Sequence, residues 1–134
     1  MADITITAAN VVKTSADTIT GTAGETITAG MAVYLKASDG RYWKAQADGT
    51  AAEATVVGVA LHAALAGQPL TIATSGTINI GATTAKVFYY VSATAGGIAP
   101  VADLTSGQYI SSVGYATATD GSFVVKPSVT GATV

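Results

Sequence analysis

The sequence predicts an all-β fold, a small barrel or sandwich. Apolar and polar residues alternate with period two along short segments, and clusters of Gly, Asp and Ser separate these segments. No long segment shows a helical period, and residues 50–55 and 62–65 are long enough for a helical turn only. The chain has 134 residues, which fits one domain that buries about two-thirds of its unfolded surface without a disulfide or a metal.

Four segments show the alternation most clearly: residues 4–7, 57–62, 70–73 and 77–80. The side chains expected to face the core are Val57, Val59, Leu61, Leu70, Ile72, Ile78 and Ile80, while Ile4 and Ile6 alternate with Thr5 and Thr7. Turns are expected at residues 38–40, 47–49, 66–69, 75–76, 96–97, 106–107 and 120–121, where Gly, Pro, Asp and Ser gather. These elements predict strands of four to seven residues joined by tight turns.

The chain also matches itself at a displacement of about 56 residues. Residues 32–35 then lie over 88–91, and Val57-Gly58-Val59-Ala60 lies over Val113-Gly114-Tyr115-Ala116. The ordered series of matches predicts two pseudo-repeats, about 29–82 and 85–134, in a single β domain of residues 29–134. Two such units can cover each other's apolar faces.

Residues 1–28 lie outside the predicted repeats and are rich in Thr and Ala. Their few large apolar residues cannot form a core, so we expect an extended N-terminal arm that adds to a sheet of its own domain or of a neighbour. The candidate contact residues of this arm are Ile4, Ile6, Val11, Val12 and Ile19.

The composition argues against several classes of protein. Charged residues make up 10% of the chain, against about 25% in ordinary soluble domains. The formal net charge of -2 argues against nucleic acid as a partner, because phosphate binding requires clustered Lys and Arg. No cysteine is present, and no apolar stretch is long enough to cross a membrane. We expect a protein kept in a cytoplasm, whose surface is either covered in an assembly or simply rich in Thr.

No residue pattern predicts catalysis. The single histidine, His62, ends an alternating segment and is expected at a rim or a subunit contact. The eight carboxylates are dispersed, and several stand in turns, where Asp caps the backbone. The glycines are spaced as hairpin turns and form no phosphate-binding loop. We therefore expect no enzyme activity, no cofactor and no metal site.

Basic and aromatic residues concentrate around the predicted turn at residues 38–40: Lys36, Arg41, Tyr42, Trp43 and Lys44. One interpretation is a hairpin whose aromatic side chains pack on the core while the basic ones are solvated. A second is a contact patch, because Trp, Tyr and Arg are frequent anchors of protein interfaces. A third is a carbohydrate platform. In the second pseudo-repeat, Phe88-Tyr89-Tyr90 allows the same interpretations, and Tyr89 is expected in the core.

The order of these segments resembles the capsid decoration, or cement, proteins of tailed bacteriophages. The resemblance rests on residues 27–35, the Asp-Gly hairpin, Val57-Gly58-Val59-Ala60, the segment 66–72 and Ser75-Gly76. It covers residues 27 to 80 well and 86 to 131 more weakly. Met31 stands where the family usually has Asp after the Ala-Gly step.

The resemblance implies a compact β-tulip-like domain without catalytic activity. It implies a homotrimer on the outer surface of the icosahedral head of the virion, made in the host cytoplasm, with the major capsid protein as its partner. The arm would then contact the capsid or a neighbouring decoration subunit, and Arg41, Tyr42, Trp43, Lys44 and His62 join the arm residues as candidate contacts. The alternative function is a carbohydrate-binding or adhesion module of a phage tail or a cell surface.

Overall fold

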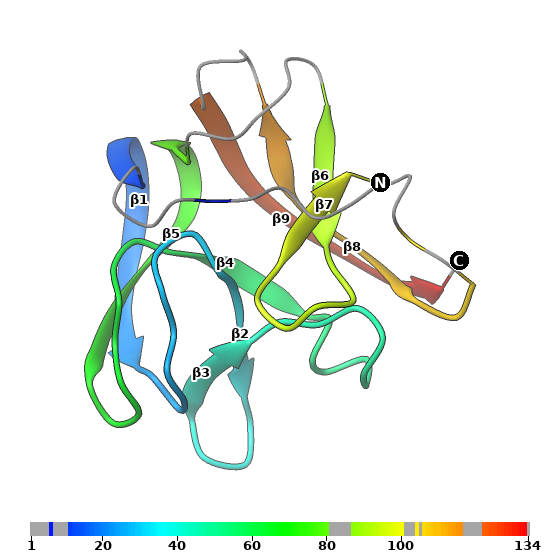
Figure 1. The fold of residues 1–134 in the computed structure, drawn as a ribbon, viewed down its shortest axis with the longest axis horizontal. Helices are drawn as coiled ribbons and strands as arrows, with labels where there is room; N and C mark the ends of the chain where they lie inside the picture. Colours follow the sequence, from blue (N-terminus) through cyan, green and yellow to red (C-terminus); the bar gives the residue numbers. More distant parts are fainter. Residues whose placement is uncertain are drawn as a thin grey trace.

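The computed structural model describes residues 6, 11–80, 87–100, 104, 106–116 and 122–133. Within these residues the fold is all-β, as predicted, and one antiparallel sheet curls into a half-barrel (Figure 1). The strands are β1 (Val12–Thr22), β2 (Ala32–Lys36), β3 (Arg41–Lys44), β4 (Val56–Ala60), β5 (Pro69–Asn79), β6 (Phe88–Val91), β7 (Ile98–Pro100), β8 (Tyr109–Ala116) and β9 (Ser122–Thr133).

The sheet has two halves that meet in its middle. Strand order is β3-β2-β4-β5-β9-β8-β6-β7, and β1 pairs with β5 outside this path. We call β2 to β5 the first half and β6 to β9 the second half. They join where β5 pairs with β9, with Thr77 opposite Val124 and Ile78 opposite Phe123. The main-chain hydrogen bonds of the sheet therefore run through both halves.

The two halves use the same strand pairing. In the first half Ala32 pairs with Val59, Val33 with Gly58 and, after a register shift, Tyr34 with Val56. In the second half Phe88 pairs with Tyr115, Tyr89 with Gly114 and, after a shift at the same place, Tyr90 with Ser112. Each residue of the second set follows its counterpart by about 56 positions. The predicted duplication remains a hypothesis about the origin of the sequence, and this shared register is its structural counterpart.

Strand β5 differs from its prediction. A turn was expected at Ser75-Gly76 between two strands, but one strand runs from Pro69 to Asn79. Gly76 has a φ of 92° and lies beside a register shift between β1 and β5. Only glycine adopts this conformation readily, so the residue bends the strand without ending it.

The structure also corrects, in part, the prediction of which β4 side chains face the core. Val57 was expected in the core beside Val59 and Leu61, but Val57 is half-buried and Val56 is buried instead. The register shift between the Val33 and Tyr34 pairs passes over Val57 and changes the alternation there. Val59 is buried as predicted, and Leu61 is half-buried against the main core.

The core consists of two clusters on opposite faces of the first half. Ala32, Tyr34 and Val59 belong to the main cluster, which also contains Tyr89 and Phe123 of the second half. The predicted core residues Ile78, Ile80 and Tyr89 are buried in this cluster. The smaller cluster is formed by Ala23, Ile27, Val33, Ala60, Ala64, Leu70 and Ile72.

The segment after β1 covers the smaller cluster. Ala23 and Ile27 are fully buried, and the backbone of Ile27 exchanges two hydrogen bonds of 2.9 Å with that of Ala64. Residues 62–65, expected to allow a helical turn, take part in this antiparallel bridge instead. At residues 50–55 a single helical turn is present, in which the N–H of Ala54 donates to the carbonyl of Thr50 at 3.3 Å.

The described part of the predicted arm lies on its own domain. β1 pairs with β5 along its length, from Val12 opposite Asn79 to Thr22 opposite Pro69. This is the first of the two partners expected for the arm, a sheet of its own domain. Residues 1–5 and 7–10 lie outside the described residues.

Candidate functional site

The β2–β3 hairpin is organised by Asp39. Its Oδ1 accepts the backbone N–H of Arg41 at 2.9 Å, and its Oδ2 accepts Trp43 Nε1–H at 3.0 Å. The hydrogen bond from Arg41 lowers the pKa of the Asp39 carboxyl, while desolvation acts against this, and Trp43, Lys36 and Arg41 lower it further. The exposed turn thus holds a charged carboxylate that fixes the indole.

Trp43 is half-buried and is contacted by its neighbours. Lys36 Nζ lies 4.3 Å from the centroid of its ring, a cation–π geometry. Gly24 lies so close to the pyrrole part of the indole that a Cβ there would collide with it. Tyr42 packs against the smaller cluster, and Arg41 is exposed. Neither Tyr42 nor Trp43 is therefore a freely exposed aromatic platform.

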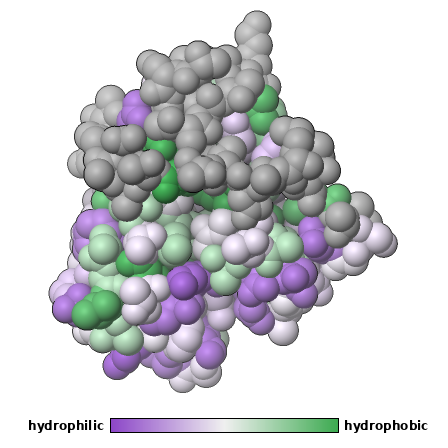
Figure 2. Space-filling model, viewed as in Figure 1, coloured by the Kyte–Doolittle hydropathy of each residue, from purple (hydrophilic) through white to green (hydrophobic). Residues whose placement is uncertain are grey.

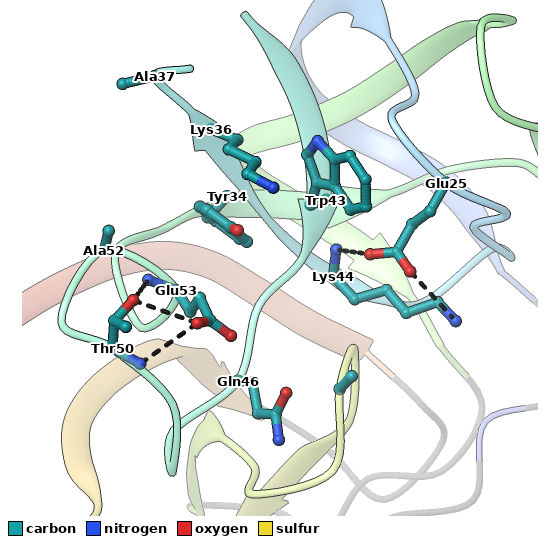
Figure 3. Close-up of a pocket in the computed structure, with 11 residues that line it drawn as sticks. Glu25, Tyr34, Lys36, Ala37, Trp43, Lys44, Gln46, Thr50, Ala52 and Glu53 are labelled. Atoms are coloured by element: carbon teal, nitrogen blue, oxygen red, sulfur yellow. Dashed lines mark hydrogen bonds and ion pairs between the residues drawn. The ribbon is translucent and has the colours of Figure 1, made fainter. Parts of the chain in front are cut away.

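A polar cleft of about 420 Å³ opens beside Trp43 (Figure 3). It is formed by strands β2 and β3, the segment after β1, the loop that follows β3 and one residue of the turn after β6. The lining residues are Glu25, Tyr34, Lys36, Ala37, Trp43, Lys44, Gln46, Thr50, Ala52, Glu53 and Ala95. Its volume lies in the range of small-molecule sites, about 300–1,000 Å³.

Two carboxylates of the cleft are held by local contacts. Glu25 Oε2 accepts the backbone N–H of Lys44 at 3.0 Å, and Glu25 Oε1 lies 3.9 Å from Lys44 Nζ. Glu53 Oε1 accepts the Thr50 hydroxyl at 3.2 Å and the Thr50 N–H at 3.4 Å, while Thr50 Oγ1 accepts the N–H of Glu53 at 3.3 Å. This reciprocal arrangement is a capping box, which fixes the loop that carries Glu53.

Tyr34 is the most buried large polar side chain of the cleft, with 7% of its surface exposed. Figure 3 shows it between Lys36 and Trp43 on one side and Glu53 on the other, with the hydroxyl directed into the space between them. Burial raises the pKa of this hydroxyl, and the charges of Glu53, Glu25 and Asp39 raise it further. At neutral pH Tyr34 is therefore a protonated donor.

His62 lies in the turn between β4 and β5, away from this cleft. Its Nε2 accepts the backbone N–H of Thr71 at 3.0 Å, and its Nδ1 lies 2.9 Å from the carbonyl oxygen of Ala63. The neutral ring with a proton on Nδ1 satisfies both contacts. The side chain is exposed, and its contacts with Ala63 and Thr71 link the two sides of the turn.

The candidate contacts in the first 28 residues have different surroundings. Ile4 lies outside the described residues, and of Val12 only the backbone is described, in β1. Val11 is buried in the main cluster and Ile6 packs against it. Ile6 also lines a groove of about 190 Å³ beside Gly30 and Ile98. Ile19 is 36% exposed.

A row of apolar side chains outside the core clusters lies on the second half, and the sequence pattern singled out only Phe88 among its members. We define the outer row as Phe88, Tyr115 and Val124, which stand opposite one another on β6, β8 and β9. Phe88 is 57% exposed, and its ring centroid lies 5.4 Å from that of Tyr115. Tyr115 and Val124 are half-buried.

The matching positions in the first half have the opposite environment. Ala32, Val59 and Ala73 stand opposite one another on β2, β4 and β5, and all three are fully buried in the main cluster. The first half is thus covered on both faces, whereas the second half leaves this face open. On the face shown in Figure 2, hydrophilic residues form small patches among residues of intermediate and hydrophobic character.

No group of three or more His, Asp or Glu side chains among the described residues could hold a metal ion. The part of the chain that the structure describes also contains no helix long and apolar enough to cross a membrane.

The sequence matches no protein-family model, and the search of curated proteins found no match.

Proposed function

We propose that this chain is a capsid decoration protein of a tailed bacteriophage. In this role it binds the outer surface of the icosahedral head and clamps neighbouring subunits of the major capsid protein, as a homotrimer and without enzymatic activity. The proposal rests on the resemblance of residues 27–80 to that family, and it is supported by the character of the surface.

The outer row is the observation that carries the proposal. Contiguous apolar patches on a protein surface often mark interaction sites. Here a Phe and a Tyr in ring contact lie on a sheet face whose counterpart is completely covered in the first half. Aromatic side chains of this kind are frequent energetic centres of protein interfaces. A head offers many equivalent sites, so a trimer gains avidity from modest individual contacts.

The low charge fits the same role. With 10% charged residues, the chain has little of the charge that ordinarily keeps soluble proteins apart. Contacts with a shell and with other decoration subunits would cover part of this surface.

Co-sedimentation with expanded, DNA-free heads of the cognate phage tests the proposal. We expect the wild-type chain to sediment with the heads and Phe88→Ser to bind at least tenfold more weakly. Leu65→Ser is the matched control, because Leu65 is 58% exposed and lies in the β4–β5 turn, outside the outer row. The proposal is wrong if the wild-type chain stays in the supernatant at saturating concentration.

The arm is tested separately. Because β1 lies on its own domain and Ile6 packs against the main cluster, only residues 1–5 are removed. We expect lower occupancy on the heads at equal protein concentration, with an unchanged thermal midpoint. Equal occupancy would show that this segment has no role in capsid binding.

The alternative function, a glycan platform formed by Tyr42 and Trp43, is less compatible with the geometry. Tyr42 packs on the smaller cluster, and Trp43 is contacted by Lys36, Gly24 and Asp39. Stacking of a sugar requires an open ring face.

A further inference from the structure

The polar cleft beside Trp43 contains a hydroxyl donor to which no described residue forms a hydrogen bond. Tyr34 is 7% exposed, and among the described residues no hydrogen bond reaches its hydroxyl. The hydroxyl oxygen itself stays accessible, because among the described residues Ser111 Oγ is the one buried side-chain polar atom without a hydrogen-bond partner. Since the hydroxyl opens into the cleft, a bound molecule can accept its hydrogen bond (Figure 3).

Among the described residues, the charges that line the cleft balance. Lys36 and Lys44 are opposed by Glu25 and Glu53. Lys44 already faces Glu25, and Lys36 lies over the ring of Trp43. A ligand with a net charge would gain little from such a site, since its attraction to one pair is offset by repulsion from the other.

The hydrogen-bonding groups are mixed in the same way. Tyr34 Oη and the two lysine ammonium groups donate, whereas Glu53 and Gln46 offer acceptor oxygens. A matching ligand must therefore carry hydrogen-bond acceptors and donors close together on one of its faces. Hydroxyl groups both donate and accept hydrogen bonds, so a molecule with several hydroxyls can bond to residues on both sides of the cleft at once.

From this geometry we propose that the cleft binds a neutral, hydroxyl-rich ligand, namely a short oligosaccharide held mainly by hydrogen bonds. The proposal goes beyond capsid decoration and does not depend on it. It also differs from the stacking platform described above, because the ligand forms hydrogen bonds with Tyr34, Glu53 and Gln46, while Trp43 only lines the cleft.

Trp43 makes the proposal directly measurable, because it is the one tryptophan of the chain. Its indole N–H resonance in an NMR spectrum therefore reports on the cleft alone. The probes are neutral di- to tetrasaccharides of glucose, galactose, mannose and N-acetylglucosamine. Two further probes, a sialylated trisaccharide and a Lys-Glu dipeptide, represent charged and zwitterionic ligands.

We expect at least one neutral saccharide to shift the Trp43 signal in a saturable manner. Its affinity should change less than twofold between low and high salt, because no net charge is neutralised. Tyr34→Phe should weaken binding about fivefold to tenfold, the usual effect of losing one hydrogen bond of about 1 kcal/mol. Tyr90→Phe, the counterpart of Tyr34 in the second half, should bind like the wild type.

Three outcomes would overturn the proposal. The first is that none of the neutral saccharides shifts the Trp43 signal at millimolar concentration. In the second, Tyr34→Phe and Tyr90→Phe bind equally well, which would place the saccharide elsewhere. In the third, the charged or zwitterionic probe binds more tightly than every neutral one. None of these outcomes bears on head binding, which is read from sedimentation with heads.

Discussion

Gly58 and Gly114 occupy the same position in the two halves of the sheet, and each lies against the neighbouring strand where no side chain fits. A Cβ on Gly58 would lie 2.9 Å from Ile72 Cγ2 and would also meet the carbonyl of Ala73. A Cβ on Gly114 would lie 2.8 Å from Phe123 Cε1 and would meet the carbonyl of Val124. The close approach of β4 to β5 and of β8 to β9 therefore depends on glycine.

We expect Gly58→Ala and Gly114→Ala each to lower the free energy of unfolding by about 3 kcal/mol, because the paired strands must separate to admit the methyl group. Gly67→Ala is the control. Its φ of 86° makes a side chain costly, but open space surrounds it, so the loss should be about 1 kcal/mol. Urea denaturation measures all three, and equal losses would contradict the packing explanation.

Phe88 and Tyr89 are neighbours in β6 with opposite roles. Tyr89 is 2% exposed and its ring lies 5.9 Å from that of Phe123. We expect Tyr89→Ala to destabilise the fold by about 3–5 kcal/mol. Phe88→Ser removes an exposed side chain and should cost less than about 1 kcal/mol. Thermal unfolding compares the two, and a large loss for Phe88→Ser would show that the outer row is part of the core.

The Asp39 contacts predict an acid-dependent contribution to stability. The folded-state pKa of Asp39 lies below its unfolded value of about 4. Folding therefore favours the charged form, and this contribution is complete above about pH 4 and is lost as the pH falls through the folded-state pKa. Asp39→Asn should be less stable than the wild type at pH 7, and the difference should shrink in acid. A difference that stays constant or grows in acid, measured by urea denaturation, would refute this account.

The His62 contacts predict a local effect without a catalytic one. His62→Ala removes the acceptor of the Thr71 N–H, and we expect a loss of about 1 kcal/mol in stability. Amide hydrogen exchange at Thr71 should become faster, while the amides of Val59 and Ala73 keep their protection. Unchanged exchange at Thr71 would mean that the imidazole does not hold this turn.

The fold class follows from the sequence because period-two patterns report directly which face of a strand is buried. Ile78, Ile80 and Tyr89 were placed correctly by this rule. It failed at Val57, where a register shift breaks the alternation, and at Gly76, where glycine bends a strand that the sequence suggested would end. A single sequence does not distinguish a glycine that ends a strand from one that bends it.

The cleft was predictable only in part. Trp43, Lys36 and Lys44 stood out because they are close together in the sequence. Tyr34 looked like an ordinary strand residue, and Glu25 and Glu53 come from segments far from the hairpin, so only folding brings them together. The spacing of Thr50 and Glu53 is a capping-box signal that could have located one wall. Nothing in the pattern distinguished the buried Ala32 from its exposed counterpart Phe88, because that difference depends on how the halves stack.

The bend at Gly76 has a consequence for how the chain unfolds. One unbroken strand exchanges main-chain hydrogen bonds with β4 before the bend and with β9 after it. Among the described residues, the hydrogen-bonded ladders of the two halves therefore share one continuous peptide backbone. The chain should melt in one cooperative transition, and neither half should persist after the other has come apart.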